Sequence, residues 1–589
     1  MKDSVNVHNK DYELGGQINE RSASKFTFRT RGFLALILTC SLLSFFTFRR
    51  PTLEALNVSP TDGLKDACPQ AAPISPSFHK DLHGDLEEEY ATDEFRLKAY
   101  ESLGGAVRIP TEAYDDLKPP GQDPRWKIFD KFHAYLEETF PLVHTTLRKT
   151  TVNSYALVYH WQGTDPSLKP ILLTAHQDVV PVDPHTLDQW LQPPYSGFYD
   201  GKWIWGRGSC DDKPGLIGSI TAVESLIAKG FKPKRSVVLA YGIDEERGGI
   251  SGGPAIRDHL LSTYGAYAFS ILIDEGGDLD VRDDVVIASP AVAEKGHFDL
   301  RLVVSTLGGH SSVPPVHTSI GILAGLIVQL EDNPHTPHLN RNDTYYTNLQ
   351  CQAAFDPDLS DELRTAIQWS LTSDWALKDL ESQLFESDPR LRAIGSTTQA
   401  VDLISGGVKV NALPEEATAV VNHRVAGWSS VSALKTRIVE VLLPTVKKYN
   451  LSLDAFGEEI GDDFLTAAGQ LTLSDAFGTA LEPAPITATS HNAAYEFLSG
   501  TIIAVEKSSA KGSRADVPVV VAPGILIGNT DTRYYWNVTE NIFRYGHVDR
   551  YAKYNGAHTV NEALLAEAFI ELIRFFTVVI LNADETNLL

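Results

Sequence analysis

Cysteine and positive charge are both scarce in this chain, and each shortage excludes a class of protein. Four cysteines in 589 residues, with no CxxC pair, do not form the disulfide framework of a small secreted domain. Cys40 lies in an apolar segment, so Cys68, Cys210 and Cys351 allow at most one disulfide bond and one free thiol. The formal net charge of -25 leaves no basic footprint for nucleic acid. We therefore expect a globular body, large enough for more than one domain, that binds no nucleic acid.

One apolar run near the N-terminus predicts a membrane anchor. Residues 32–48 carry no charge and number about 17, the lower limit of the roughly 17–25 residues that span a bilayer. The alternative is a cleaved signal peptide, but the preceding tail is long and no A-x-A site follows. A small excess of Lys and Arg before the run favours a cytoplasmic tail, residues 1–31, and a lumenal body. The Pro-rich, charged residues 49–94 predict a stalk.

Asn-x-Ser/Thr triplets agree with a lumenal body. The triplet at Asn57 is followed directly by Pro60 and is a poor acceptor. The triplets at Asn342, Asn450 and Asn537 have no such obstacle, and we predict that these three residues are glycosylated.

Beyond the predicted stalk, short β-rich apolar runs alternate with segments of helical period. The strand-like runs include SYALVYHW, PILLTAHQ, SVVLAYGI and AFSILIDE, and the helical ones include KIFDKFHAYLEETF and GLIGSITAVESLIAKGF. This alternation predicts an α/β fold with a mainly parallel sheet.

Polar residues with metal-binding side chains stand where these runs end. His176 and Asp178 are two residues apart at a strand end, so both side chains face one side. The carboxyl ends of strands are where open α/β sheets keep their ligand sites. Taken alone, the pair is more often explained by a histidine hydrogen-bonded to a turn carboxylate.

Further polar residues also stand where an apolar run ends or a helix begins. Asp211 lies in a Gly-rich loop before a helix, where an acidic pair could be no more than an N-cap. The other candidates are Glu245 and Glu246, Asp274 and Glu275, and His558. Histidine and carboxylate ligands without a thiolate suit Zn²⁺. A pair of ions needs a bridging carboxylate, for which Asp211 is the candidate, and the adjacent glutamates permit one ligand and one general base.

The motifs HQD, GRGSCDDK, DEERGG, IDEG, GGHSS and GAHTVNE occur in this order. From about Phe95 to the C-terminus the chain resembles the zinc metallopeptidase family that contains carboxypeptidase G, aminoacylase-1 and vacuolar carboxypeptidase S. It is most similar to the carboxypeptidase S branch, which shares the short tail and single anchor. The resemblance implies a doubly wound, mainly parallel catalytic domain in two parts, 95–293 and 458–589. It also implies an inserted α+β sandwich domain, 294–457, that acts as a lid and a homodimer contact.

The resemblance assigns roles to the strand-end residues. It implies two Zn²⁺ ions held by His176, Asp211 as bridge, Glu246, His558 and a fifth ligand. That ligand is Asp274 if the strand end decides and Glu275 if alignment on the following glycine decides. Asp178 would orient His176, and Glu245 would be the general base.

Four further residues resemble groups that handle substrate in the family. His310 in GGHSS resembles the residue that polarises the scissile carbonyl. Asn411 and Arg424 resemble lid residues that hold substrate, and Arg533 resembles the arginine of a TDxR motif. For either arginine the alternative is an ordinary surface salt bridge.

The sequence thus predicts a membrane-anchored, lumenal zinc carboxypeptidase of vacuole-like membranes that acts on short peptides of Gly-Xaa type. An N-acyl-amino-acid amidohydrolase is the first alternative, because the chemistry is the same and only the substrate pocket differs. A non-enzymatic sorting or binding protein is the second, and the intact set of predicted ligands with Glu245 and His310 counts against it.

Overall fold

The computed structural model describes residues 62–460, 467–509 and 516–589. Within these ranges no helix combines the length and apolar character that a membrane span requires. The predicted tail, the predicted anchor, Cys40 and the Asn57 triplet lie outside them.

The larger of two main sheets has ten strands and is parallel at its centre. The four central strands, in spatial order β6, β3, β7 and β20, are mutually parallel, whereas β1 and β2 run antiparallel at one edge. The α/β prediction is therefore confirmed, with a sheet that is mixed at its edges. The strands are β1 (Arg148–Val152), β2 (Ala156–Trp161), β3 (Ile171–His176), β6 (Val237–Gly242), β7 (Ile271–Val281), β8 (Val286–Ala288), β9 (Ala291–Glu294), β18 (Val519–Val521), β19 (Gly524–Leu526) and β20 (Ile542–Asp549).

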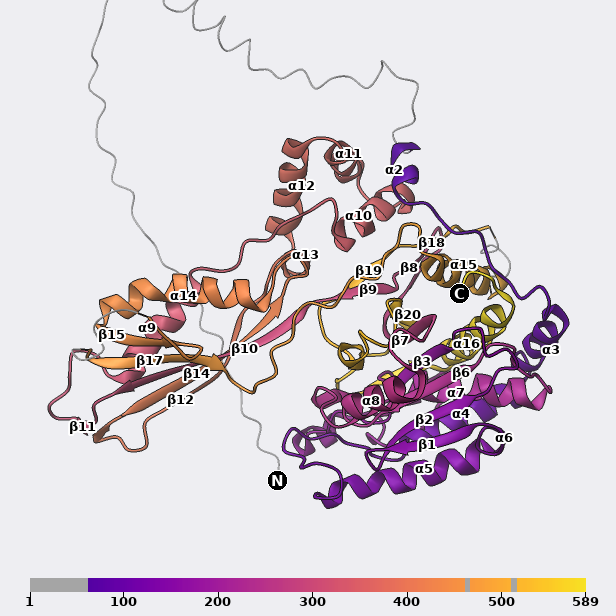
Figure 1. Cartoon of the computed structure of the whole chain (residues 1–589), viewed down its shortest axis with the longest axis horizontal. Coiled ribbons are helices and arrows are strands. Elements are labelled where there is room, and N and C mark those ends of the chain that lie inside the picture. The colour runs from indigo at the N-terminus through magenta and orange to yellow at the C-terminus, as the bar shows by residue number, and fades with distance from the viewer. Residues whose placement is uncertain (1–61, 461–466, 510–515) are drawn as a thin grey trace, which may run out of the picture. The chain divides into compact units, whose positions relative to one another are not determined.

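Helices cover both faces of this sheet because its central strands are apolar on both sides (Figure 1). Along β3, Ile171 and Leu173 join the core beneath α7 (Lys213–Ala228) and α16 (Ala566–Glu585), and Leu172 joins the core beneath α8 (Gly252–Tyr264). The remaining elements around the sheet are α4 (Asp93–Val107), α5 (Ile128–Thr139), α6 (Pro141–Thr146), α15 (Ala493–Ser509), β4 (Phe198–Tyr199), β5 (Trp203–Trp205) and β21 (Ala563–Leu565).

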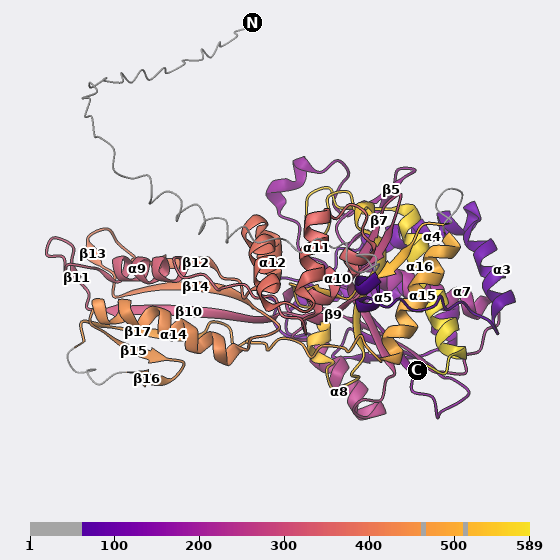
Figure 2. The same ribbon diagram turned by 90° about the horizontal axis from the view of Figure 1, so that it is seen from above.

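A six-stranded sheet with two helices forms a smaller domain, residues 296–475. Its strands lie in the order β12, β14, β10, β17, β15 and β16, and α9 and α14 pack side by side on one face (Figure 2). The elements are β10 (Gly296–Thr306), α9 (Ser319–Glu331), β12 (Ala400–Gly406), β14 (Glu416–Val425), α14 (Val431–Lys448), β15 (Leu451–Ala455), β16 (Glu458–Ile460) and β17 (Gly469–Asp475), with β11 (Gly309–His310) and β13 (Ala412–Leu413) as a separate pair.

The predicted boundary of this domain at residue 457 is wrong. Strand β17 pairs with β10 and β15, so the polar segment after β16 connects two strands of one sheet and does not end the domain. Four further helices follow one another between α9 and β12. They are α10 (Thr344–Phe355), α11 (Asp361–Ser370), α12 (Asp374–Ser387) and α13 (Pro389–Gly395).

These four helices are joined to the N-terminal part of the described chain by a disulfide bond. Cys351 in α10 pairs with Cys68, just after α2 (Asp62–Ala67). Leu64 of α2 is buried in the apolar cluster that these four helices form. Cys210 is a free thiol. The expectation of at most one bridge and one free thiol is confirmed for these three cysteines.

The predicted stalk is wrong from residue 62 onward. Helix α3 (Lys80–Tyr90) packs on α16 through Leu86 and Tyr90, which are fully buried, and the Tyr90 hydroxyl lies 2.9 Å from Oγ1 of Thr577. The backbone N–H of Phe78 donates to the carboxylate of Glu585 at 2.8 Å. This segment is therefore part of the globular body.

Candidate metal centre and active site

The loop after β3 fixes His176 through Asp178. Nδ1 of the buried His176 ring lies 3.0 Å from the Asp178 carbonyl oxygen and 3.3 Å from its Oδ1. The Asp178 carboxylate also accepts the backbone N–H groups of Glu245 at 3.2 Å and Glu246 at 3.1 Å. Strands β3 and β6 are parallel neighbours, so the loops that follow them lie side by side at one edge of the sheet. Asp178 can therefore hold both the His176 ring and the loop after β6.

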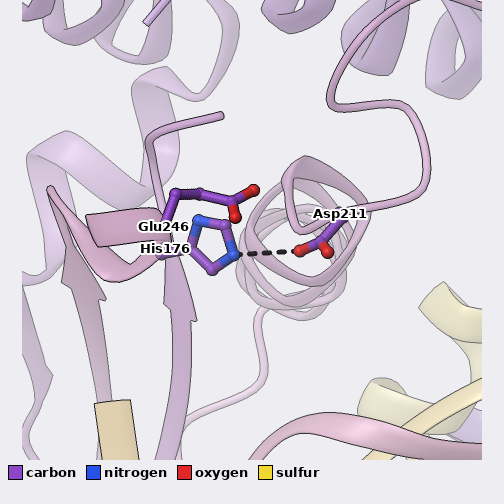
Figure 3. Close-up of side chains that lie close together, drawn as sticks. All are labelled: His176, Asp211 and Glu246. Carbon is purple, nitrogen blue, oxygen red and sulfur yellow. Dashed lines mark hydrogen bonds and ion pairs between the residues drawn. The ribbon is translucent and has the colours of Figure 1, made fainter. Parts of the chain in front are cut away.

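Asp211 lies between two histidines that are far apart in the sequence. Its Oδ1 lies 3.0 Å from Nε2 of His176, and its Oδ2 lies 3.3 Å from Nε2 of His558. Figure 3 shows the side chains of His176, Asp211 and Glu246 pointing toward one another. A carboxylate that offers one oxygen to each histidine has the arrangement of a bridging metal ligand.

One more carboxylate stands beside each histidine. Oε2 of Glu246 lies 3.0 Å from Nε2 of His558, and Oε1 of Glu275 lies 3.5 Å from Nε2 of His176. The ligand atoms of His176, Glu245 and Glu275 also lie within 4.8 Å of one another. The structure therefore brings together six of the predicted residues, with Asp211 in the middle.

Asp274 is turned to other partners. Its Oδ1 accepts a hydrogen bond of 2.7 Å from Oγ1 of Thr174, a neighbour across the β3–β7 pair. Adjacent residues of a strand point to opposite faces, so Asp274 and Glu275 cannot both face His176. The geometry favours Glu275 as the fifth ligand, and Asp274 remains the other predicted candidate.

The electrostatics of the cluster suit bound cations. Burial, together with neighbouring carboxylates, raises the pKa of Glu245, Glu275 and Glu246 above the usual range of a glutamate. Hydrogen bonds to Asp211 and Glu246 raise the pKa of His558 to about 10. The cluster contains more buried carboxylates than histidines, so without a metal ion some of the carboxylates would have to bind protons. Divalent ions would neutralise them, and His and carboxylate donors are ligands that Zn²⁺ accepts.

A cavity of about 290 Å³ opens beside the cluster. Asp211, Glu245, Glu246, Glu275 and His558 line it, and its apolar wall includes Leu564, Leu572 and Phe576. Cys210 also lines it, and burial raises the pKa of its thiol, so this cysteine is protonated and serves as a filler of the wall.

The predicted substrate residues lie outside this lining. His310 in β11 is exposed, and so is Asn411, the residue directly before β13. Nδ1 of His310 lies 2.7 Å from Oγ of Ser312. Arg424 is half-buried on β14, and its Nη1 donates to Oδ1 of Asn529 at 2.9 Å. The Arg533 side chain lies next to Gly248. A Cβ atom added to Gly248 would lie 3.5 Å from Nη1 of Arg533. Neither arginine forms an ion pair with a carboxylate of the described residues, so the surface salt-bridge reading is wrong for both in this part of the chain.

Two supports of the Asp211 loop were not predicted. Glu562 forms an ion pair with Arg207 and accepts the backbone N–H of Cys210 at 2.8 Å. Nζ of the fully buried Lys213 donates to the carbonyls of Ala106 at 2.9 Å and Ile109 at 2.7 Å. The sequence signal for these supports was the presence of Arg207 and Lys213 inside GRGSCDDK, because a buried Arg or Lys needs fixed partners.

This cluster lies at the carboxyl edge of an α/β sheet, where open α/β enzymes keep their ligand sites. Residues 172–582 match the family described as Peptidase family M20/M25/M40, and the chain belongs to that family.

Relatives agree over most of the chain. Carboxypeptidase S of Saccharomyces cerevisiae is 38% identical over 524 residues, which cover 88% of this chain and 89% of the relative. The N-fatty-acyl-amino acid synthase/hydrolase PM20D1 of Mus musculus is 31% identical over 503 residues, with coverages of 84% and 89%. Among solved structures, human carnosine dipeptidase 1 superposes with a TM-score of 0.56 at 15% identity, covering 87% of this chain and 100% of that one. That likeness shows a shared fold.

Proposed function

We propose that the protein is a dinuclear zinc carboxypeptidase that hydrolyses the C-terminal peptide bond of short peptides of Gly-Xaa type. The observation that carries the proposal is the position of Asp211 between His176 and His558, with Glu245 beside the pair. The similarity to a relative named carboxypeptidase S supports the direction of cleavage.

Each histidine has its own carboxylate in this proposal. His176 and Glu275 would hold one ion, His558 and Glu246 the other, and Asp211 both. Zinc, when bound, supplies a Lewis acid that polarises the scissile carbonyl and lowers the pKa of water.

Glu245 would be the general base. Its backbone is fixed by Asp178, and its side chain lies at the wall of the cavity within reach of the cluster. Its carboxylate takes a proton from the attacking water and delivers it to the leaving amine nitrogen.

Arg424 and Arg533 would read the free carboxylate of the substrate. A guanidinium binds a carboxylate through two parallel hydrogen bonds, and neither arginine forms an ion pair with a carboxylate of the described residues. The test compares kcat/KM for free and C-terminally amidated Gly-Leu. We expect a difference of orders of magnitude, because an unpaired buried charge costs roughly 2–5 kcal/mol. Equal rates on both peptides would exclude a carboxypeptidase.

Hydrolysis of N-acyl amino acids is the second candidate. The observation that favours it is the apolar wall of Leu564, Leu572 and Phe576, together with the relatives named N-fatty-acyl-amino acid synthase/hydrolase. Such a substrate also ends in a free carboxylate, so the amidation test does not separate the two. Rates on Gly-Leu and on N-acyl-leucine, measured side by side, do.

A lumenal, vacuole-like location with an anchor at residues 32–48 belongs to the same proposal. The Cys68–Cys351 bond supports it, because disulfides persist in oxidising compartments. Asn342, Asn450 and Asn537 are exposed, as glycosylation requires. Glycosidase treatment should lower the apparent mass of the wild type, and replacing all three asparagines should abolish that shift.

A homodimer through the smaller domain is also proposed. Strand β12 lies at the edge of its sheet with Leu403 and Ile404 exposed, and Val408 and Val410 follow without cover. His310 and Asn411 stand next to this patch, so a second copy would adjoin both. Ile404→Lys should convert the dimer to a monomer in light scattering, and a wild-type monomer would contradict the proposal.

A further inference from the structure

Asn529 connects the smaller domain to the cavity. It lies between β19 and the TDTR residues, and its side-chain amide is used at both ends. Nδ2 donates to the Lys295 carbonyl at 2.6 Å, and Oδ1 accepts from Nη1 of Arg424 at 2.9 Å. One donor end and one acceptor end fix the orientation of the amide.

The loop that carries Asn529 has a rigid base. Glu294 and Arg544 form a fully buried ion pair of 2.8 Å. The Glu294 carboxylate also accepts the backbone N–H of Thr530 at 3.0 Å and Oγ1 of Thr532 at 3.1 Å. Because these bonds are shielded from water, the residue next to Thr530 is held firmly in place.

The charge of Arg424 is left free by this contact. Burial lowers the pKa of Arg424, and the charge of Asp299 only partly offsets the effect of burial and of the nearby Arg533. Among the described residues no carboxylate forms an ion pair with its guanidinium, and the neutral amide of Asn529 is its hydrogen-bond partner. A carboxylate in place of the amide would neutralise the guanidinium, whereas Oδ1 of Asn529 only aligns it. A half-buried cation held in this way is set to receive an anion from outside.

Asn529 also lines the cavity that contains Glu245 and Glu275. We propose that Asn529 is a positioning and specificity-determining residue, which holds the Arg424 guanidinium beside the cavity with its charge available for the α-carboxylate of the substrate. The inference rests on the proposed carboxypeptidase function.

The test uses Asn529→Asp and Asn529→Ala in the full-length protein. Asp keeps the shape of Asn, but it neutralises Arg424 and turns an oxygen toward the Lys295 carbonyl. We expect kcat/KM for free Gly-Leu to fall roughly 100-fold in Asn529→Asp and roughly tenfold in Asn529→Ala, mainly through KM. The rate on amidated Gly-Leu should change by less than about twofold, because that substrate does not use the guanidinium charge.

Asn348→Ala is the matched control. Nδ2 of Asn348 also donates to a backbone carbonyl, that of Pro523 at 3.0 Å, but it does not contact Arg424. This variant should keep the wild-type ratio between the free and the amidated peptide. Zinc content and melting temperature, measured for every variant, show whether a loss reflects unfolding.

Three results would overturn the inference. Equal losses on free and amidated peptide in both Asn529 variants would assign Asn529 a purely structural role. If the wild type itself cleaves both peptides equally, the carboxypeptidase function fails and the inference fails with it. Discrimination in the wild type that survives unchanged in Asn529→Asp overturns the inference alone.

Discussion

Glu245 and Glu246 are adjacent in the sequence, yet the structure gives them different neighbours. Glu246 lies 3.0 Å from His558, whereas Glu245 joins His176 and Glu275. Glu246 therefore belongs with the ion that His558 would bind, and Glu245 is left for proton transfer.

Glu245→Gln separates these roles. The amide keeps the size of the side chain but cannot accept a proton, so turnover should fall roughly 10²–10⁴-fold. Zinc content, measured by mass spectrometry, should equal that of the wild type. Glu137→Gln, at an exposed partner of Lys149, is the control and should leave activity intact. Loss of zinc in Glu245→Gln would make Glu245 a ligand.

The fifth ligand can be assigned by a pair of variants. Glu275→Ala should lower the zinc stoichiometry to one ion, because His176 and Asp211 alone hold the first site poorly. Asp274→Asn should keep both ions, since its Oδ1 is already occupied by Thr174. The reverse pattern of zinc content would select Asp274.

At the level of single residues, strand ends were the informative positions. His176, Asp211, Glu246, Glu275 and His558 were all candidates from the sequence, because each stands next to an apolar run or a helix start. Asn529 was not, since its two partners come from segments that only the folded chain brings close.

Among the elements, β14 carries a histidine whose protonation state affects stability. His423 is fully buried, and burial lowers its pKa to about 4 from an ordinary value of 6.5. The folded state therefore disfavours the proton. The contribution of neutral His423 is complete above pH 6.5 and is lost as the pH falls toward 4.

The free energy of unfolding of the smaller domain should thus be lower at pH 5 than at pH 7 by about 2 kcal/mol from His423 alone. Urea denaturation at the two pH values, followed by tryptophan fluorescence, measures the difference. His423→Gln should reduce the difference, and His338→Gln, at a half-exposed ring, should not. A difference unchanged in His423→Gln would refute this account.

Two elements show why patterns of charge mislead. Leu82, Leu86 and Tyr90 recur every four residues in α3, which is helical spacing, but the charged residues between them resembled a linker. The break after β16 resembled a domain boundary because it is polar. Whether a polar segment leaves a domain or connects two of its strands depends on strand pairing, which local composition does not encode.

For the whole molecule, the corrected stalk changes where the folded body begins. A chain that starts at residue 62 should fold and keep its activity, since it retains α2, Cys68 and α3. A chain that starts at residue 95 loses these elements and uncovers α16, so it should aggregate or melt at a lower temperature. Soluble yield and thermal denaturation of the two chains provide the comparison. Equal stability would mean that residues 62–94 are dispensable after all.

The order in which the ribosome delivers the ligands follows from the placement of His558. Four of the five ligands favoured by the geometry precede the smaller domain, whereas His558 and the central strand β20 come near the end of the chain. A nascent polypeptide therefore contains an unfinished sheet and lacks one of the five ligands until translation is almost complete. Hydrolytic activity should therefore arise only after β20 and His558 have been synthesised.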